Sequence, residues 1–324
     1  MKYFPHFISS MALVIILGYI QFDQNKEEVE ATTDEHEAIN AQVPYYRVDN
    51  PPEGEYAGYL NAVSLELPEE LYFAGERVPL EIPDVRERLD RELHINTYWH
   101  SSTIFLIKRA HRWLPQMEVI LREHGIPDDF KYLTAIEGGF VNGVSPKNAV
   151  GFWQILKSSG KENGLEITRS VDERYDPLKS TEAACKYLKK AHRKFNNWTN
   201  AAASYNRGMR GLQRALDNQQ VDSYYDLLLN SETSRYVFRI LAIKEIIEHP
   251  AKYGFNIDEG HLYEQEKLRY VEVDKNINDL VKFAKDQGIN YKLLKRHNPW
   301  LRDDQLDVSR NKTYRIAIPV DSAP

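Results

Sequence analysis

Apolar residues recur at intervals of three and four through the middle of this chain, and this spacing constrains its fold more than any other feature. The pattern starts at Val85 and continues to Ile247. It is typical of helices that each bury one face. Pro115 is expected in the first turn of a helix, and Gly125 is expected to end one. The spacing predicts a mainly α protein with one helical domain over residues 85–255.

The C-terminal tail follows a different pattern. Residues 269–273 and 312–319 alternate like strands, whereas residues 276–286 and 291–296 have helical spacing, with Gly288 between them. The order strand, helix, helix, strand predicts a small independent module over residues 264–320.

The N-terminal residues suggest export. Lys2 precedes an uncharged run over residues 7–22, somewhat shorter than the ~20 residues of an ideal spanning helix. We expect residues 1–22 to be a signal or anchor segment that places the protein in the cell envelope or periplasm, tethered to a membrane by residues 7–22. A cleaved signal and a cytosolic chain are the alternatives. Residues 23–55 are acidic and predicted to be a disordered linker. Residues 56–84 remain an unassigned lead-in.

Charge and cysteine content narrow the function classes. The 324 residues carry a formal net charge of -6, so nucleic acid is not an expected partner. Cys185, the single cysteine, lies in a helical pattern and is expected to be a buried small hydrophobe. The histidines lack metal-ligand spacing and no phosphate-binding glycine loop is present, so we expect no cofactor and no metal site. The oligomeric state is not predicted.

One carboxylate is placed where acid catalysis is plausible. Glu137 follows an apolar helical run and precedes Gly138 and Gly139. Partial burial beside Leu133 and a position in the last helical turn both disfavour its charged form, so its pKa should be raised, as a general acid requires. The alternative is a surface acid at a helix end, with the two glycines as a cap.

Glycosidases ordinarily use a second carboxylate. The candidates by proximity in sequence are Glu162, Glu166, Asp172 and Glu173, and none is convincing. Asp172 and Glu173 are expected to be solvated. A mechanism with one acid remains possible if the substrate supplies its own nucleophile.

Four motifs occur in order along the helical region: Glu137, then residues 145–154 (SPKNAVGFWQ), residues 204–208 (SYNRG) and residues 232–237 (ETSRYV). Together they resemble the lysozyme-like lytic transglycosylases of the membrane-bound murein transglycosylase D type, over roughly residues 85–250. The resemblance implies a lysozyme-like fold and cleavage of peptidoglycan between N-acetylmuramic acid and N-acetylglucosamine. The product would carry a 1,6-anhydro ring.

The resemblance also implies roles for individual residues. Glu137 would be the sole acid and base. Tyr205 would orient Glu137 or the sugar, Asn206 would hold the loop, and Tyr236 would line the cleft. The remaining expected contacts to glycan come from Ser145, Gly151 and Gln154.

The chain departs from the family pattern at a few positions. Gly138 stands where the family usually has Ser, Ser204 replaces Ala, and Phe152 replaces Leu. The segment from Glu137 to Ser145 is also about one residue shorter than in the family. A muramidase of the same fold that uses water, and a catalytically inactive glycan-binding scaffold, are the alternative functions.

The tail resembles a divergent LysM module, a family that binds glycan containing N-acetylglucosamine. Lys275-Asn276-Ile277 replaces the usual Gly-Asp-Thr near the first turn. Glycan binding and a purely structural role both remain open for it.

Overall fold

The computed structural model describes residues 63–320, and helices dominate it, which confirms the mainly α prediction. The helical region consists of α2 (Pro83–Tyr98), α3 (His100–Glu123), η1 (Asp128–Tyr132), α4 (Leu133–Glu137), α5 (Lys157–Glu162), η2 (Glu173–Tyr175), α6 (Pro177–Phe195), α7 (Trp198–Arg207), α8 (Met209–Gln219), η3 (Tyr224–Asp226), α9 (Ser231–Glu248), η4 (Pro250–Tyr253) and η5 (Glu259–His261).

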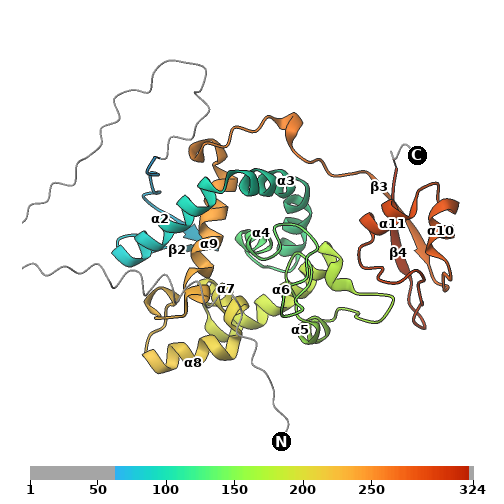
Figure 1. Cartoon of the computed structure of the whole chain (residues 1–324). Coiled ribbons are helices and arrows are strands. Elements are labelled where there is room, and N and C mark those ends of the chain that lie inside the picture. Colours follow the sequence, from blue (N-terminus) through green and yellow to red (C-terminus); the bar gives the residue numbers. More distant parts are fainter. Residues whose placement is uncertain (1–62, 321–324) are drawn as a thin grey trace, which may run out of the picture. The chain divides into compact units, whose positions relative to one another are not determined.

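The short helix α4 lies at the centre of this region, with α3, α6 and α9 around it (Figure 1). Leu133 and Thr134 of α4 are fully buried. The long helix α9 packs against α2, α4 and α7, and its buried residues therefore include neighbours in sequence such as Val237 and Phe238. A helix that packs on several sides buries apolar residues around much of its circumference. The end of α4 is thus packed against α9 and η1.

Residues left unassigned from the sequence join this core. A two-stranded hairpin, β1 (Tyr72–Phe73) and β2 (Glu76–Arg77), places Phe73 at 0% exposure. The Glu76 carboxylate accepts hydrogen bonds from the backbone N–H groups of Trp198 (2.6 Å) and Thr199 (2.8 Å). It therefore satisfies donors at the start of α7 that the helix itself leaves open. The hairpin is part of the folded domain.

Pro115 lies inside α3, so the prediction that it begins a helix is wrong. Buried residues on both sides of it, from Ala110 and Leu114 to Met117 and Leu121, form one continuous face. Burying that face favours a continuous helix despite the hydrogen bond that proline removes.

The C-terminal module has the predicted order of elements: β3 (Leu268–Val273), α10 (Leu280–Asp286), α11 (Tyr291–His297) and β4 (Tyr314–Pro319). The strands pair antiparallel, from Leu268 opposite Pro319 to Val273 opposite Tyr314. Leu280, Leu294 and Ile316 belong to a separate hydrophobic core. The first helix begins at Leu280 and not at Asn276, because the Asp279 carboxylate caps it.

The predicted anchor (1–22) and acidic linker (23–55) lie outside the described residues. Among residues 63–320, no helix combines the length and the apolar character that crossing a membrane requires.

Candidate active site

Glu137 is the last residue of α4, and its side chain is partly buried. The Tyr236 hydroxyl, on α9, donates a hydrogen bond to Glu137 Oε1 at 2.6 Å. Tyr236 is itself only 2% exposed. Its hydroxyl therefore orients the carboxyl group. That Tyr236 also lines the cleft stays a prediction.

Burial raises the pKa of Glu137, and the charge of Glu232 raises it further. The hydrogen bond from Tyr236 and the positive charge of Arg239 lower the pKa by less, so the net direction is upward, as predicted. Arg239 also donates to the carbonyl of Ile136 (3.0 Å) and so neutralises part of the negative end of α4. Desolvation is thus the main cause.

The segment 143–155 folds into a tight loop after α4. Val150 forms isolated bridges with both Val144 and Ile155. Ser145 Oγ accepts a hydrogen bond from the backbone N–H of Ala149 (3.0 Å), so the hydroxyl stabilises this turn. Gln154, at φ +46°, donates its side-chain amide to the carbonyl of Gly151 (2.8 Å). These contacts give both predicted glycan-binding side chains a structural role in the loop.

Tyr205, on α7, packs beside the same site. Its hydroxyl donates to the carbonyl of Trp153 (2.8 Å), and its pKa is raised well above the ordinary value, first by burial and then by the charge of Glu137. Tyr205 and Gln154 line a hollow of about 100 Å³. Tyr205 therefore fixes the end of the loop near Glu137, while the direct contact to the carboxyl group comes from Tyr236.

Asn206 joins the end of α7 to the start of α9. Its Oδ1 accepts a hydrogen bond from Thr233 Oγ1 (2.9 Å), and its Nδ2 donates to Glu232 Oε1 (3.1 Å). Glu232 is the acid whose charge acts on Glu137, and sequence reasoning placed it only within a motif.

Two glycines are required by close backbone packing. Gly151 has φ +83°, and a Cβ there would lie 2.1 Å from the carbonyl oxygen of Arg174. A Cβ at Gly138 would lie 2.8 Å from the carbonyl oxygen of Phe152 and 2.9 Å from that of Gly151. The loop backbone thus lies directly against Gly138, and a side chain at this position would force the loop to shift.

An ion pair that the sequence did not predict supports the loop formed by residues 143–155. Arg174 donates to both carboxylate oxygens of Asp172, at 3.0 and 2.7 Å, and to the carbonyls of Asn148 and Ile155, each at 3.2 Å. Asp172 is 7% exposed, so the expectation that it is solvated is wrong. The signal was present: an acid and an arginine two residues apart can form a bidentate pair across a short turn.

The other candidate acids are occupied or exposed. Glu166 accepts hydrogen bonds from Tyr314 (2.9 Å) and Lys312 (2.6 Å), both in the C-terminal module. Glu173 accepts from the backbone N–H of Glu166 (2.7 Å), and Glu162 is exposed. Glu166 and Glu173 are therefore held in place by the hydrogen bonds that they accept.

The single cysteine and the possible metal ligands are the remaining residues of chemical interest. Cys185 is buried, as predicted, and burial raises its pKa to about 12. Within residues 63–320, no group of three or more His, Cys, Asp or Glu side chains could hold a metal ion.

Comparisons with known proteins bear on both parts of the chain. Residues 122–227 match the family described as "Transglycosylase SLT domain", and residues 269–322 match the "Soluble lytic transglycosylase C-terminal LysM-like domain". Glu137 and the loop after it lie within the first match, whereas Tyr236 follows it.

Membrane-bound lytic murein transglycosylase D of Escherichia coli strain K12 is 27% identical over 246 residues, which cover 73% of this chain and 53% of that protein. The protein of strain O6:H1 gives the same values. A putative tributyltin chloride resistance protein of Alteromonas sp. strain M-1 is 29% identical over 112 residues, 34% of this chain and 54% of that protein. The chain spans about half the length of these curated relatives. It therefore carries a lysozyme-like transglycosylase SLT domain followed by a LysM-like domain, and it is homologous to the membrane-bound lytic murein transglycosylase D proteins.

Proposed function

We propose that this protein is a peptidoglycan lytic transglycosylase that cleaves the β-1,4 bond between N-acetylmuramic acid and N-acetylglucosamine, with Glu137 as the sole acid and base. The observation that carries the proposal is the partly buried Glu137 carboxyl group, with a raised pKa and a 2.6 Å hydrogen bond from Tyr236. The SLT and LysM-like matches support a murein substrate.

The first step needs a proton donor. Because burial raises the pKa of Glu137, the side chain holds its proton at a pH where an exposed glutamate has lost it. The proton passes to the glycosidic oxygen as that bond breaks and N-acetylglucosamine leaves. The acetamido oxygen of the muramic sugar stabilises the developing positive charge. The Tyr236 hydroxyl and the charge of Arg239 stabilise the Glu137 carboxylate that forms.

The second step uses the same group as a base. The carboxylate removes the proton from the 6-hydroxyl of the muramic sugar, whose oxygen closes the 1,6-anhydro ring. Glu137 regains its proton, and no water is consumed. Glu166, Asp172 and Glu173 are engaged elsewhere by hydrogen bonds, which favours a mechanism without a second carboxylate.

The cellular location follows from the proposed substrate. Murein lies outside the cytoplasmic membrane, and the relative that covers 73% of this chain is described as membrane-bound. We extend the proposal to an envelope protein, tethered by residues 7–22.

Product analysis tests the reaction. Purified sacculi are digested with the full chain and the soluble products are weighed by mass spectrometry, where anhydro products are lighter by one water than hydrolysis products. Glu137→Gln should lower the rate by about 10²–10⁴-fold, because general acid catalysis contributes that much. Glu162→Gln, a change at an exposed acid, is the matched control and should leave the rate unchanged.

Each contrary result points to one alternative. Reducing-end products from the wild type would identify a muramidase. Binding of sacculi without any cleavage would identify an inactive scaffold. Equal rates for wild type and Glu137→Gln would remove Glu137 from the mechanism.

A further inference from the structure

One turn of the helical domain is shared with the C-terminal module. We call residues 166–175, between α5 and α6, the docking segment, and Figure 1 shows the chain between these helices extending toward β4. Val171 of this segment is 0% exposed and belongs to the hydrophobic core of the module, whose other buried members all lie between residues 273 and 318. The docking segment therefore completes the core of a module that comes much later in the chain.

Backbone hydrogen bonds on both sides of Val171 fix the docking segment to the module. The N–H of Asp172 donates to the carbonyl of Trp300 (2.9 Å), and the N–H of Arg302 donates to the carbonyl of Ser170 (2.8 Å). Paired backbone groups of this kind set one register between two segments, as in an antiparallel ladder. The docking segment thus has a defined position on the module.

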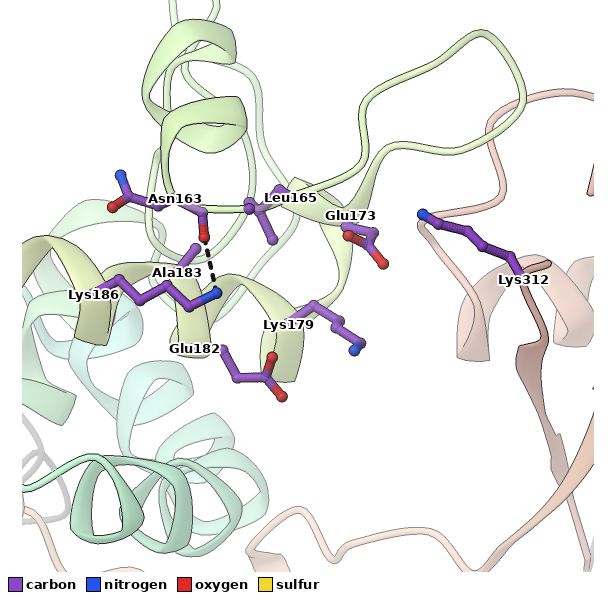
Figure 2. A pocket seen from close by; sticks show the side chains of 9 residues that line it. Asn163, Leu165, Glu173, Lys179, Glu182, Ala183, Lys186 and Lys312 are labelled. Carbon is purple, nitrogen blue, oxygen red and sulfur yellow. Dashed lines mark hydrogen bonds between the residues drawn. The ribbon is translucent and has the colours of Figure 1, made fainter. Parts of the chain in front are cut away.

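Side chains of the module hold the start of the docking segment. Lys312 pairs with Glu166 (2.6 Å), and the Tyr314 hydroxyl donates to the same carboxylate (2.9 Å). Figure 2 shows the Lys312 ammonium group pointing from the module toward Glu173 as well. Burial of an apolar side chain, backbone hydrogen bonds and an ion pair therefore all contribute to one contact.

The docking segment also contacts the loop 143–155 beside Glu137. Arg174 donates to the carbonyls of Asn148 and Ile155, each at 3.2 Å. Its own carbonyl oxygen lies so close to Gly151 that a Cβ there would come within 2.1 Å of it. The side chain and the backbone of one residue of the docking segment therefore fix this loop.

A second connection runs through Tyr175. The guanidinium carbon of Arg302, in the module, lies 3.7 Å from the centre of the Tyr175 ring. The carbonyl of the same tyrosine accepts a hydrogen bond from Asn142 Nδ2 (3.0 Å), and Asn142 follows Glu137 closely in the chain. One residue thus joins a side chain of the module to the segment after the candidate acid.

We propose that the C-terminal module positions the active site: by holding the docking segment through Val171 and Arg302, it keeps the loop 143–155 in the conformation that cleavage requires. Chains of packed groups and hydrogen bonds carry energetic coupling between distant sites. Val171 and Arg302 are positioning residues, because they act on the loop through the docking segment. The consequence for cleavage rests on the proposed function, whereas the coupling between module and loop does not.

Hydrogen exchange followed by mass spectrometry measures this coupling in the full chain. Val150 and Ile155 each donate a backbone N–H to the other's carbonyl, so slow exchange reports an ordered loop. Arg302→Ala removes an exposed cation–π contact and should accelerate exchange in peptides covering 143–155 about twofold to fivefold. Val171→Ala removes buried methyl groups and should accelerate it about tenfold.

Matched variants show whether the effect belongs to the docking contact. Arg315→Ala removes a similar contact inside the module, where the guanidinium carbon lies 4.4 Å from the centre of the Tyr270 ring, and it should leave exchange in the loop unchanged. Arg302→Lys keeps a cation over Tyr175 and should restore most of the protection. Peptides from α3 and α9 should exchange as in the wild type in every variant, because the change is local.

Digestion of soluble glycan strands measures the consequence for the reaction. In Arg302→Ala, kcat should fall about twofold to fivefold, because fewer molecules keep the loop ordered. A module that only captures glycan would instead raise KM in its variants and leave kcat unchanged.

Two results would overturn the positioning role. One is unchanged exchange of the loop in both Arg302→Ala and Val171→Ala. The other is equal acceleration in α3, α9 and the loop, which would show a general loss of stability. If the wild type cleaves no strand, the proposed function fails, while the exchange experiment still decides whether the module and the loop are coupled.

Discussion

Two acids of the helical domain are shielded from solvent in opposite ways. Asp172 is paired through both of its oxygens with the guanidinium group of Arg174, so its charge is compensated. Glu137 has a neutral partner, the Tyr236 hydroxyl, and its pKa is raised. A full ion pair compensates the charge of a buried carboxylate, whereas a neutral donor orients the group and adds no opposite charge.

The two acids are also linked through the loop between them. Arg174 binds carbonyls at both ends of the segment 148–155, and the backbone of Gly151 and Phe152 lies against Gly138, next to Glu137. The Asp172–Arg174 pair therefore supports the loop that lies beside Glu137. Substitutions at the Asp172–Arg174 pair should mainly lower the free energy of unfolding, whereas substitutions at Glu137 and Tyr236 should mainly lower the rate of the reaction.

The largest effect on stability is expected from Arg174→Met. The substitution leaves Asp172 buried without its partner, which should lower the free energy of unfolding by about 3–5 kcal/mol. Urea denaturation followed by circular dichroism measures this change. Arg169→Met is the matched control, because the Arg169 side chain is 83% exposed in its pair with Asp303 and should cost less than about 1 kcal/mol. Equal losses in the two variants would contradict a structural role for the buried pair.

Tyr236→Phe should lower the rate of the catalysed reaction. A hydrogen bond to a charged group contributes about 1.5–3 kcal/mol, so kcat/KM should fall by about tenfold to a hundredfold. Because this bond lowers the pKa of Glu137, removing it raises that pKa, and the alkaline limb of the pH profile should move to higher pH.

The control for this variant uses a second tyrosine bonded to α9. The Tyr253 hydroxyl donates to Glu245 (3.1 Å), and Tyr253 is 3% exposed. Tyr253→Phe should therefore reduce stability and leave kcat/KM and the pH profile unchanged. If Tyr236→Phe behaves in the same way, Tyr236 has only a structural role.

Local patterns predicted much of the fold. The spacing of apolar residues identified α9 from its first residue, Ser231, and the alternation in the tail identified both strands of the C-terminal module. Each of these elements is determined by its own residues. Pro115 was misplaced because the buried face that keeps α3 continuous depends on neighbouring helices, which no local pattern describes.

The site was predictable in its residue types but less so in its contacts. Motif residues Glu137, Gln154, Tyr205 and Tyr236 were all named from the sequence. Which tyrosine reaches the carboxyl group depends on how α9 packs on α4, and these helices are about a hundred residues apart in the chain. The support from Arg174 was missed for the same reason: its carbonyl partners lie 19 and 26 residues earlier.

The smallest effect, and the most direct test of the comparison, is the stability of Glu137→Gln as a function of pH. The pKa of Glu137 is higher in the folded than in the unfolded protein, so its contribution to stability is complete below the unfolded value and is lost as pH rises through the folded one. Glutamine carries no charge and avoids this loss. The Tm of the variant should therefore exceed that of the wild type increasingly as pH rises through that range. Asp172→Asn, which leaves Arg174 without its anion, should instead lower Tm at neutral pH. Opposite signs for these two neutralising changes would show that the ion pair compensates the charge of Asp172 and that the charge of Glu137 is compensated only in part, whereas a lower Tm for both would place Glu137 among the structural acids.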